Sequence, residues 1–196
     1  MLFRSKLKPP QDFKLGNVEG FLYPAFYSFP RGTTEEDALS AMLSRFQQST
    51  RDLSWSYEDF SKKDLLIISS LVESEGTPDV FAKVARVVYN RLDKGMKLQF
   101  DSTVHYVFDR RGEIALSLKD TQVRNKYNTF VYTGLPPGPI GSPTRAAIEA
   151  SLNPADGDWL YFVTVLPNET RFTSSYDEFL KFKAEYKRNY AKGAFE

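Results

Sequence analysis

Two glutamates close to the end of one apolar segment are the residues whose placement points most directly to chemistry. The segment Asp64-Leu-Leu-Ile-Ile-Ser-Ser-Leu-Val-Glu-Ser-Glu-Gly-Thr-Pro78 predicts a helix with Asp64 as its N-cap and with Gly-Thr-Pro closing its far end. At about 100° per residue, Glu75 falls on the same apolar stripe as Val72, whereas Glu73 falls on a different side. The two acids therefore cannot point into the same cavity.

Two effects raise the pKa of a carboxyl group that lies on the apolar stripe of a helix at the helix C-terminus. Burial and the negative end of the helix dipole both disfavour ionisation, so we expect the pKa of Glu75 to be raised. A raised pKa keeps a carboxyl group protonated near neutral pH, which is what a general acid requires. The alternative is that Glu75 caps the helix end, turns to solvent, or pairs with Arg86 or Arg91.

The composition limits the classes of function. With 196 residues the chain can form one domain, or one domain with a small appendage, and its net charge of +1 gives no electrostatic reason to bind nucleic acid. Cysteine is absent, which excludes disulfides and thiolate nucleophiles, and His105 is the only histidine. We expect His105 to be structural or to line a ligand cleft, and we expect no metal, no cofactor and no nucleic-acid partner.

The elements that must position Glu75 can be placed by their caps and turn residues. Residues 133 to 143 hold four prolines and three glycines and should form a loop. The fold class predicted is α+β, mostly helical with a small antiparallel sheet. The expected elements are a helix from Thr34 to about Ser49, the Glu75 helix, a helix begun by Thr77-Pro78, a helix capped by Ser102, a helix capped by Ser142-Pro143, a β-hairpin of residues 159–165 and 170–173, and a final helix opened by Ser175.

The ends of the chain and its hydropathy complete this organisation. Residues 1 to 16 are polar, contain Pro9-Pro10, and are predicted to be a linker or tail. No window approaches the ~18 consecutive apolar residues of a membrane span, so the chain as given is expected to be soluble.

Several motifs in a fixed order closely resemble the YceG-like (MltG) endolytic murein transglycosylases, over about residues 17 to 188. The resemblance predicts a catalytic domain over residues 17–192. Two positions depart from the family pattern: Ser102 replaces the usual proline after Gln-x-Asp, and Ala25 replaces an acid. The motifs are Val18-Glu-Gly-Phe-Leu-Tyr-Pro24, Ser70-Leu-Val-Glu-Ser-Glu75, Leu98-Gln-Phe-Asp-Ser-Thr-Val-His-Tyr106, Tyr127-Asn-Thr-Phe-Val-Tyr-Thr-Gly-Leu-Pro-Pro-Gly138, Asn153-Pro154, Trp159-Leu-Tyr-Phe-Val163 and Phe172-Thr173.

The resemblance implies a lysozyme-like active-site helix and cleavage of the β-1,4 bond from MurNAc to GlcNAc in nascent peptidoglycan, which leaves a 1,6-anhydro-MurNAc end and terminates glycan elongation. The second acid of the family's Glu-x-Glu motif is the catalytic one, and it matches Glu75, the residue that the helical stripe also selects. Other residues of the motifs are expected in the glycan cleft: Gln99, Asp101, Tyr127, Asn128 and Thr129.

The resemblance also implies a cellular setting. The family usually carries a membrane-spanning helix and a LysM-like domain ahead of this region, and both are missing from this chain, so any membrane contact is expected to come only through a segment that the chain lacks. The implied location is the extracytoplasmic face of the bacterial cytoplasmic membrane, with glycan strands as substrate and cell-wall synthases as possible partners.

Two other functions stay open at this point. A conventional muramidase would need a second carboxylate near Glu75, for which Asp101 is the best candidate, although helix capping or loop bracing is the more common role for such a residue. A glycan-binding scaffold of the elongation machinery would need no buried acid, so the position of Glu75 argues against it.

Overall fold

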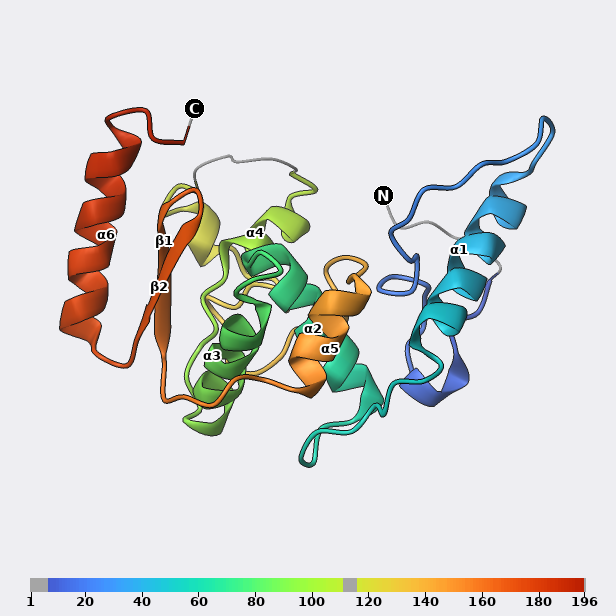
Figure 1. Cartoon of the computed structure of the whole chain (residues 1–196), viewed down its shortest axis with the longest axis horizontal. Coiled ribbons are helices and arrows are strands. Elements are labelled where there is room, and N and C mark those ends of the chain that lie inside the picture. Colours follow the sequence, from blue (N-terminus) through green and yellow to red (C-terminus); the bar gives the residue numbers. More distant parts are fainter. Residues whose placement is uncertain (1–6, 111–115, 196) are drawn as a thin grey trace.

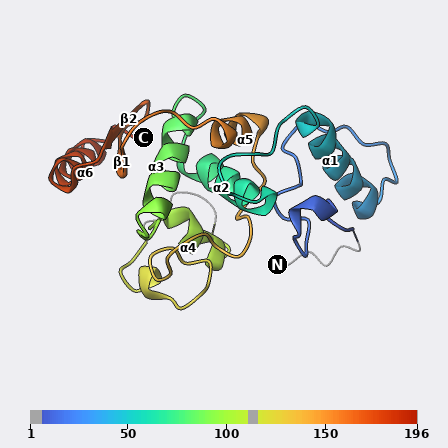
Figure 2. The same ribbon diagram turned by 90° about the horizontal axis from the view of Figure 1, so that it is seen from below.

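The computed structural model describes residues 7–110 and 116–195. These residues form a mostly helical α+β fold with one small antiparallel sheet, as predicted (Figures 1 and 2). The elements are a 3₁₀ turn at Gln11–Phe13, α1 (Glu35–Thr50), α2 (Lys62–Glu75), α3 (Phe81–Asp93), α4 (Asp101–Val107), a 3₁₀ turn at Asp120–Gln122, α5 (Arg145–Leu152), β1 (Tyr161–Leu166), β2 (Glu169–Thr173) and α6 (Tyr176–Tyr190).

Helix α2 lies in the middle of the molecule and carries both glutamates. Its N-cap is Ser61, whose hydroxyl accepts from the backbone N–H of Asp64 while the Asp64 carboxylate accepts from the backbone N–H of Ser61. The prediction of Asp64 as N-cap was therefore wrong, because Asp64 is the second half of a capping box that begins one turn earlier. Every residue from Leu65 to Val72 is buried, so α2 is enclosed on all sides.

Two hydrophobic clusters pack on α2. One joins α2 to α3 and to Leu98 and Phe100, and the other joins Leu65 and Leu66 to a group of aromatic rings from the N-terminal part of the chain. That group includes Phe13, which lies 5.1 Å from the ring of Phe21. The boundary of the linker at residue 16 stays a prediction, but Phe13 on its N-terminal side is buried in this cluster.

The end of α2 is held tightly against the start of α3. At Gly76 an added Cβ would come within 3.1 Å of Val84 and 3.2 Å of Phe81, so a residue without a side chain permits this close approach. Helix α3 begins at Phe81 after a turn, without a side-chain cap, and the prediction of Thr77-Pro78 as its start was wrong. Instead, the Thr77 hydroxyl donates to Asp79.

The hairpin and α6 form the end of the molecule opposite α1 (Figure 1). Strands β1 and β2 pair antiparallel around Pro167-Asn168, as predicted, and Thr164 lies opposite Thr170. Helix α6 packs on the hairpin, where the ring of Tyr161 stacks on Phe179 at 4.9 Å.

The loop before α5 agrees with the sequence prediction except at its end. Residues 133–143 form no helix or strand, as predicted, but the N-cap of α5 is Thr144 rather than Ser142.

No helix in the two described ranges combines the length and the apolar character needed to cross a bilayer.

Candidate active site

The carboxyl group of Glu75 is held by the first turn of α4. Glu75 Oε1 accepts a hydrogen bond from the backbone N–H of Ser102 at 3.3 Å and a second one from the Ser102 hydroxyl. The prediction of Ser102 as the helix cap was wrong: the N-cap is Phe100, which has no side chain able to cap, and the Ser102 side chain turns to Glu75 instead. The departure from the family pattern at Ser102 therefore falls on the partner of the candidate acid.

The pKa of Glu75 is raised from 4.5 to about 7. Burial is the largest cause, the two hydrogen bonds from Ser102 oppose it, and the negative charge of Asp101 adds to it. Arg91 lowers the pKa only weakly. Neither Arg86 nor Arg91 forms an ion pair with Glu75 in the described part of the chain, since their Nε atoms donate to the backbone carbonyls of Ala155 and Leu160. Glu75 is thus a carboxyl group that can be protonated at neutral pH.

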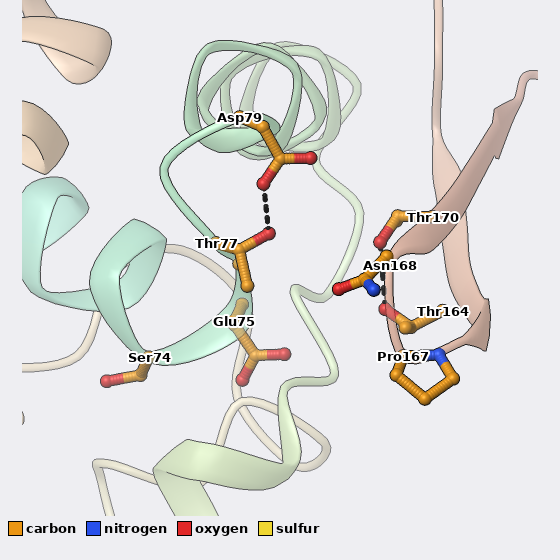
Figure 3. Close-up of a pocket in the computed structure, with 9 residues that line it drawn as sticks. Ser74, Glu75, Thr77, Asp79, Thr164, Pro167, Asn168 and Thr170 are labelled. Atoms are coloured by element: carbon orange, nitrogen blue, oxygen red, sulfur yellow. Dashed lines mark hydrogen bonds between the residues drawn. The ribbon is translucent and has the colours of Figure 1, made fainter. Parts of the chain in front are cut away.

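Glu75 faces a cavity of about 170 Å³ between the end of α2 and the hairpin. Figure 3 shows the carboxyl group directed across this space toward the hairpin. The α2 side and the turn after it contribute Ser74, Glu75, Gly76, Thr77 and Asp79, and the hairpin contributes Thr164, Pro167, Asn168 and Thr170.

Glu73 points elsewhere, as the helical stripe predicts. Its Oε2 accepts from the backbone N–H of Thr144 at 2.9 Å and from the Thr144 hydroxyl at 2.6 Å. Because Thr144 is the N-cap of α5, these two hydrogen bonds to Glu73 connect α5 to α2. The Glu73 carboxylate therefore has a structural role. Of the two glutamates, only Glu75 faces the cavity.

Gln99 and Asp101 flank the contact between Glu75 and Ser102. Gln99 is exposed and adopts a left-handed conformation with φ of 53°, and its backbone N–H donates to the carbonyl of Thr129. Asp101 is also exposed, at the start of α4. Desolvation by neighbouring groups raises the pKa of its carboxyl group, and electrostatic interactions with His105 and Lys183 oppose that rise. Asp101 does not line the cavity with Glu75 but acts on it electrostatically.

Asn128 and Thr129 are buried, and their side chains are used within the protein. The Asn128 amide donates to the carbonyls of Thr121 and Val123 and accepts from the backbone N–H of Phe130. The Thr129 hydroxyl accepts from the backbone N–H of Phe100 and lies 2.9 Å from the hydroxyl of Thr103. The Thr129 bonds connect the 127–129 loop to the segment that leads into α4 and so to Ser102, whereas the Asn128 bonds brace the loop itself.

Tyr127 lies on the other side of the same loop. It is half-buried, and its ring lies 4.8 Å from that of Tyr106 on α4. Burial raises the pKa of both phenols, and the charge of Glu19 adds to this effect. Glu19 belongs to the first motif, so the structure brings together motif residues that lie about a hundred positions apart in the chain.

Sequence reasoning missed Ser102 as the partner of Glu75, and it missed Asp79 and the hairpin residues Thr164, Asn168 and Thr170 as cavity walls. Strand alternation could have indicated that Thr164 and Thr170 share a face, because they pair across a two-residue turn. Nothing local indicates that this face turns toward Glu75, since that depends on how the hairpin packs against α3. Within the described ranges, no group of three or more acidic or histidine side chains is placed to hold a metal ion.

Replacing Ser102 should shift the pH dependence of catalysis by Glu75. Both bonds from Ser102 favour the ionised carboxylate, so Ser102→Ala should raise the pKa of Glu75. A hydrogen bond to a charged group contributes about 1.5 kcal/mol, so the shift should be about one pH unit. If protonated Glu75 is the active form, the alkaline limb of kcat/KM should move to higher pH by that amount.

A matched control is Ser117→Ala, which removes another bond from a serine hydroxyl to a carboxylate, that of Asp120, outside the cavity. Ser102→Pro removes both donors to Glu75 and should shift the limb further. An alkaline limb that stays in place in both Ser102 variants would mean that Glu75 is not the group that titrates.

Comparison with known proteins agrees with the family resemblance of the sequence motifs. The YceG-like family model matches residues 3–185. The endolytic murein transglycosylase of Bacillus subtilis is 36% identical over 193 residues, which cover 94% of this chain and 50% of that protein. The protein of the same name from Streptococcus pneumoniae R6 is 38% identical over 156 residues, covering 74% of this chain and 28% of that protein.

The fold has a solved counterpart in the crystal structure of a YceG-like protein from Listeria monocytogenes. It matches with a TM-score of 0.76 at 33% identity and covers 87% of this chain and 58% of that one. The chain therefore spans about half the length of the Bacillus subtilis relative and less than a third of the streptococcal one.

Proposed function

Because this chain belongs to the YceG-like family, we propose that it is a lytic murein transglycosylase that cuts the β-1,4 bond from MurNAc to GlcNAc within glycan strands and leaves 1,6-anhydro-MurNAc ends. The observation that carries the proposal is Glu75, a carboxyl group with a pKa of about 7 that faces a cavity of about 170 Å³. The names of the related proteins support the same class of reaction.

One carboxyl group is sufficient for this reaction. Protonated Glu75 donates its proton to the glycosidic oxygen, and the GlcNAc side leaves as an alcohol. The carboxylate then accepts the proton of the C6 hydroxyl of MurNAc while O6 bonds to C1, which closes the anhydro ring and restores the acid. No water enters the product. A pKa of about 7 suits a group that must act first as an acid and then as a base.

The remaining motif residues receive different roles in this proposal. We assign Gln99, Asp101 and Tyr127 to contacts along the glycan cleft. Thr129 acts as a positioning residue, because its buried hydrogen bonds fix the segment that carries Ser102 to Glu75, and Asn128 braces the loop that holds Thr129. Residues 17–192 form the catalytic domain in this account.

The cellular location and the partners that we propose follow from the same class of reaction. Glycan strands of peptidoglycan lie outside the cytoplasmic membrane, so the site would act at the extracytoplasmic face. The products would end growing strands, which makes cell-wall synthases the natural partners.

The experiment that tests the proposal is digestion of purified peptidoglycan sacculi and of nascent, uncrosslinked glycan strands, followed by mass spectrometry. We expect products lighter by one water than hydrolytic products and resistant to borohydride reduction. Because the cut is internal, long fragments should precede disaccharides. Binding without any cleavage would contradict the proposal and favour a scaffold.

A conventional muramidase is the second candidate, and one observation favours it. Asp79 lines the same cavity as Glu75, so a second carboxylate is available, although it is not the Asp101 that the sequence suggested. Its Oδ1 accepts from the Thr77 hydroxyl at 2.6 Å. A hydrolase would use Asp79 to activate water and would give reducing ends.

A further inference from the structure

The hairpin presents a polar face to Glu75 that the proposed chemistry does not use. Thr164 and Thr170 pair across β1 and β2 with their hydroxyl oxygens 2.9 Å apart, and both line the cavity. Asn168, at the tip of the hairpin, is exposed and lines the cavity beside them. Figure 3 shows the two hydroxyls and the Asn168 amide on the side of the hairpin that faces Glu75.

This face has hydrogen-bonding capacity left for a ligand. Two hydroxyls together hold two donors and about four acceptor positions, and their mutual bond uses one of each. One donor and about three acceptor positions therefore remain. The Asn168 side chain makes no hydrogen bond within the described residues, so its amide adds two donors and a carbonyl acceptor.

The charge of the cavity limits which ligand fits. Asp79 and Glu75 are its two ionisable residues, and no lysine, arginine or histidine of the described chain lines it. A ligand group that carries a carboxylate would meet Asp79 without a compensating cation. The cavity is also small, at about 170 Å³.

We propose that the Thr164–Thr170 pair and Asn168 form a subsite for a neutral sugar, the GlcNAc ring that leaves, and that Asp79 excludes the MurNAc ring with its acidic peptide stem. The inference rests on the proposed function. The subsite sets the orientation of the bound glycan strand. A GlcNAc ring in this subsite has its O4 next to Glu75, whereas the lactyl group of MurNAc remains outside the cavity.

The test uses the full chain with Glu75→Gln, which is expected to cleave glycan far more slowly, and chitotetraose, a neutral GlcNAc oligomer, as the probe. Chitotetraose should shift the NMR signals of Thr164, Asn168 and Thr170. In the same background, Thr164→Val with Thr170→Val should weaken binding about tenfold, because about two hydrogen bonds to the ligand are lost. The double change removes both partners of the bond together, so it leaves no unpaired hydroxyl, and valine suits a strand.

Two controls separate the subsite from general effects. Thr33→Val removes a threonine hydroxyl in the loop before α1, whose bond is local to Pro30, and should leave the affinity for chitotetraose unchanged. Asp79→Asn should strengthen binding of N-acetylmuramic acid relative to chitotetraose, since it removes the negative charge; an unchanged ratio of the two affinities would overturn the role of Asp79.

These outcomes test the subsite independently of the proposed function. Absence of chitotetraose binding, or equal affinity in the folded double valine variant, would overturn the subsite even if the chain cleaves glycan. Tenfold weaker binding in the double variant upholds the subsite, even if the chain with Glu75 intact fails to cleave glycan and the proposed function falls.

Discussion

Replacement of Glu75 by Gln is expected to lower the rate of glycan cleavage by a factor of about 10² to 10⁴, the contribution that a general acid typically makes. The change keeps the shape of the side chain, and its amide oxygen can still accept both hydrogen bonds from Ser102. The fold should therefore survive, while the proton for the glycosidic oxygen is lost. Zymography on purified sacculi, together with quantification of released fragments, measures the effect.

The matched control is Glu73→Gln, two residues earlier on the same helix. Its amide oxygen can still accept from Thr144, so α5 should stay attached and activity should remain measurable. An equal loss in both variants would remove the basis for assigning the acid to Glu75. Full activity of Glu75→Gln would place the chemistry on another residue.

The second large effect concerns stability and pH. The folded pKa of Glu75 is about 7, and its ordinary value is 4.5, so the unfolded chain loses this proton first as the pH rises. Below the ordinary value both states are protonated and the group makes no difference. Between the two values the free energy of unfolding falls as pH rises, and above the folded pKa the loss reaches its full size, up to about 3 kcal/mol.

Glu75→Gln has no proton to lose and escapes this penalty. It should resemble the wild type near pH 4 and become more stable relative to it as the pH rises to 8. Urea denaturation of both proteins at matched pH values gives the difference in unfolding free energy. A constant difference across this range, or a variant that is less stable at pH 8, would show that Glu75 is solvated or paired.

The parts of the fold that follow local rules could be predicted from the sequence. The hairpin around Pro167-Asn168 and the capping box at Thr34 depend on residues a few positions apart. The N-cap of α2 was assigned to Asp64 instead of Ser61 because Asp64 is itself a good cap residue. Helix starts at α3 and α5 were displaced because proline and serine before a helix also suit a turn.

Only part of the candidate site could be predicted from local sequence patterns. The helical stripe identified Glu75 and separated it from Glu73, because both belong to one helix whose geometry is fixed. The partner Ser102 and the cavity wall of Thr164 and Thr170 come from segments that meet Glu75 only through tertiary packing. Asn128 and Thr129 lie in a motif, yet they brace the loop from inside, and only the burial of their side chains distinguishes that role from substrate contact.

The measurement that tests the central claim most directly is cleavage of intact glycan strands in water enriched in heavy oxygen. If Glu75 alone carries the reaction, O6 of MurNAc attacks C1 and no solvent oxygen enters, so the new ends should be unlabelled 1,6-anhydro-MurNAc. Reducing ends that carry the heavy isotope would contradict the account, because water would then be the nucleophile and Asp79 the residue placed to activate it.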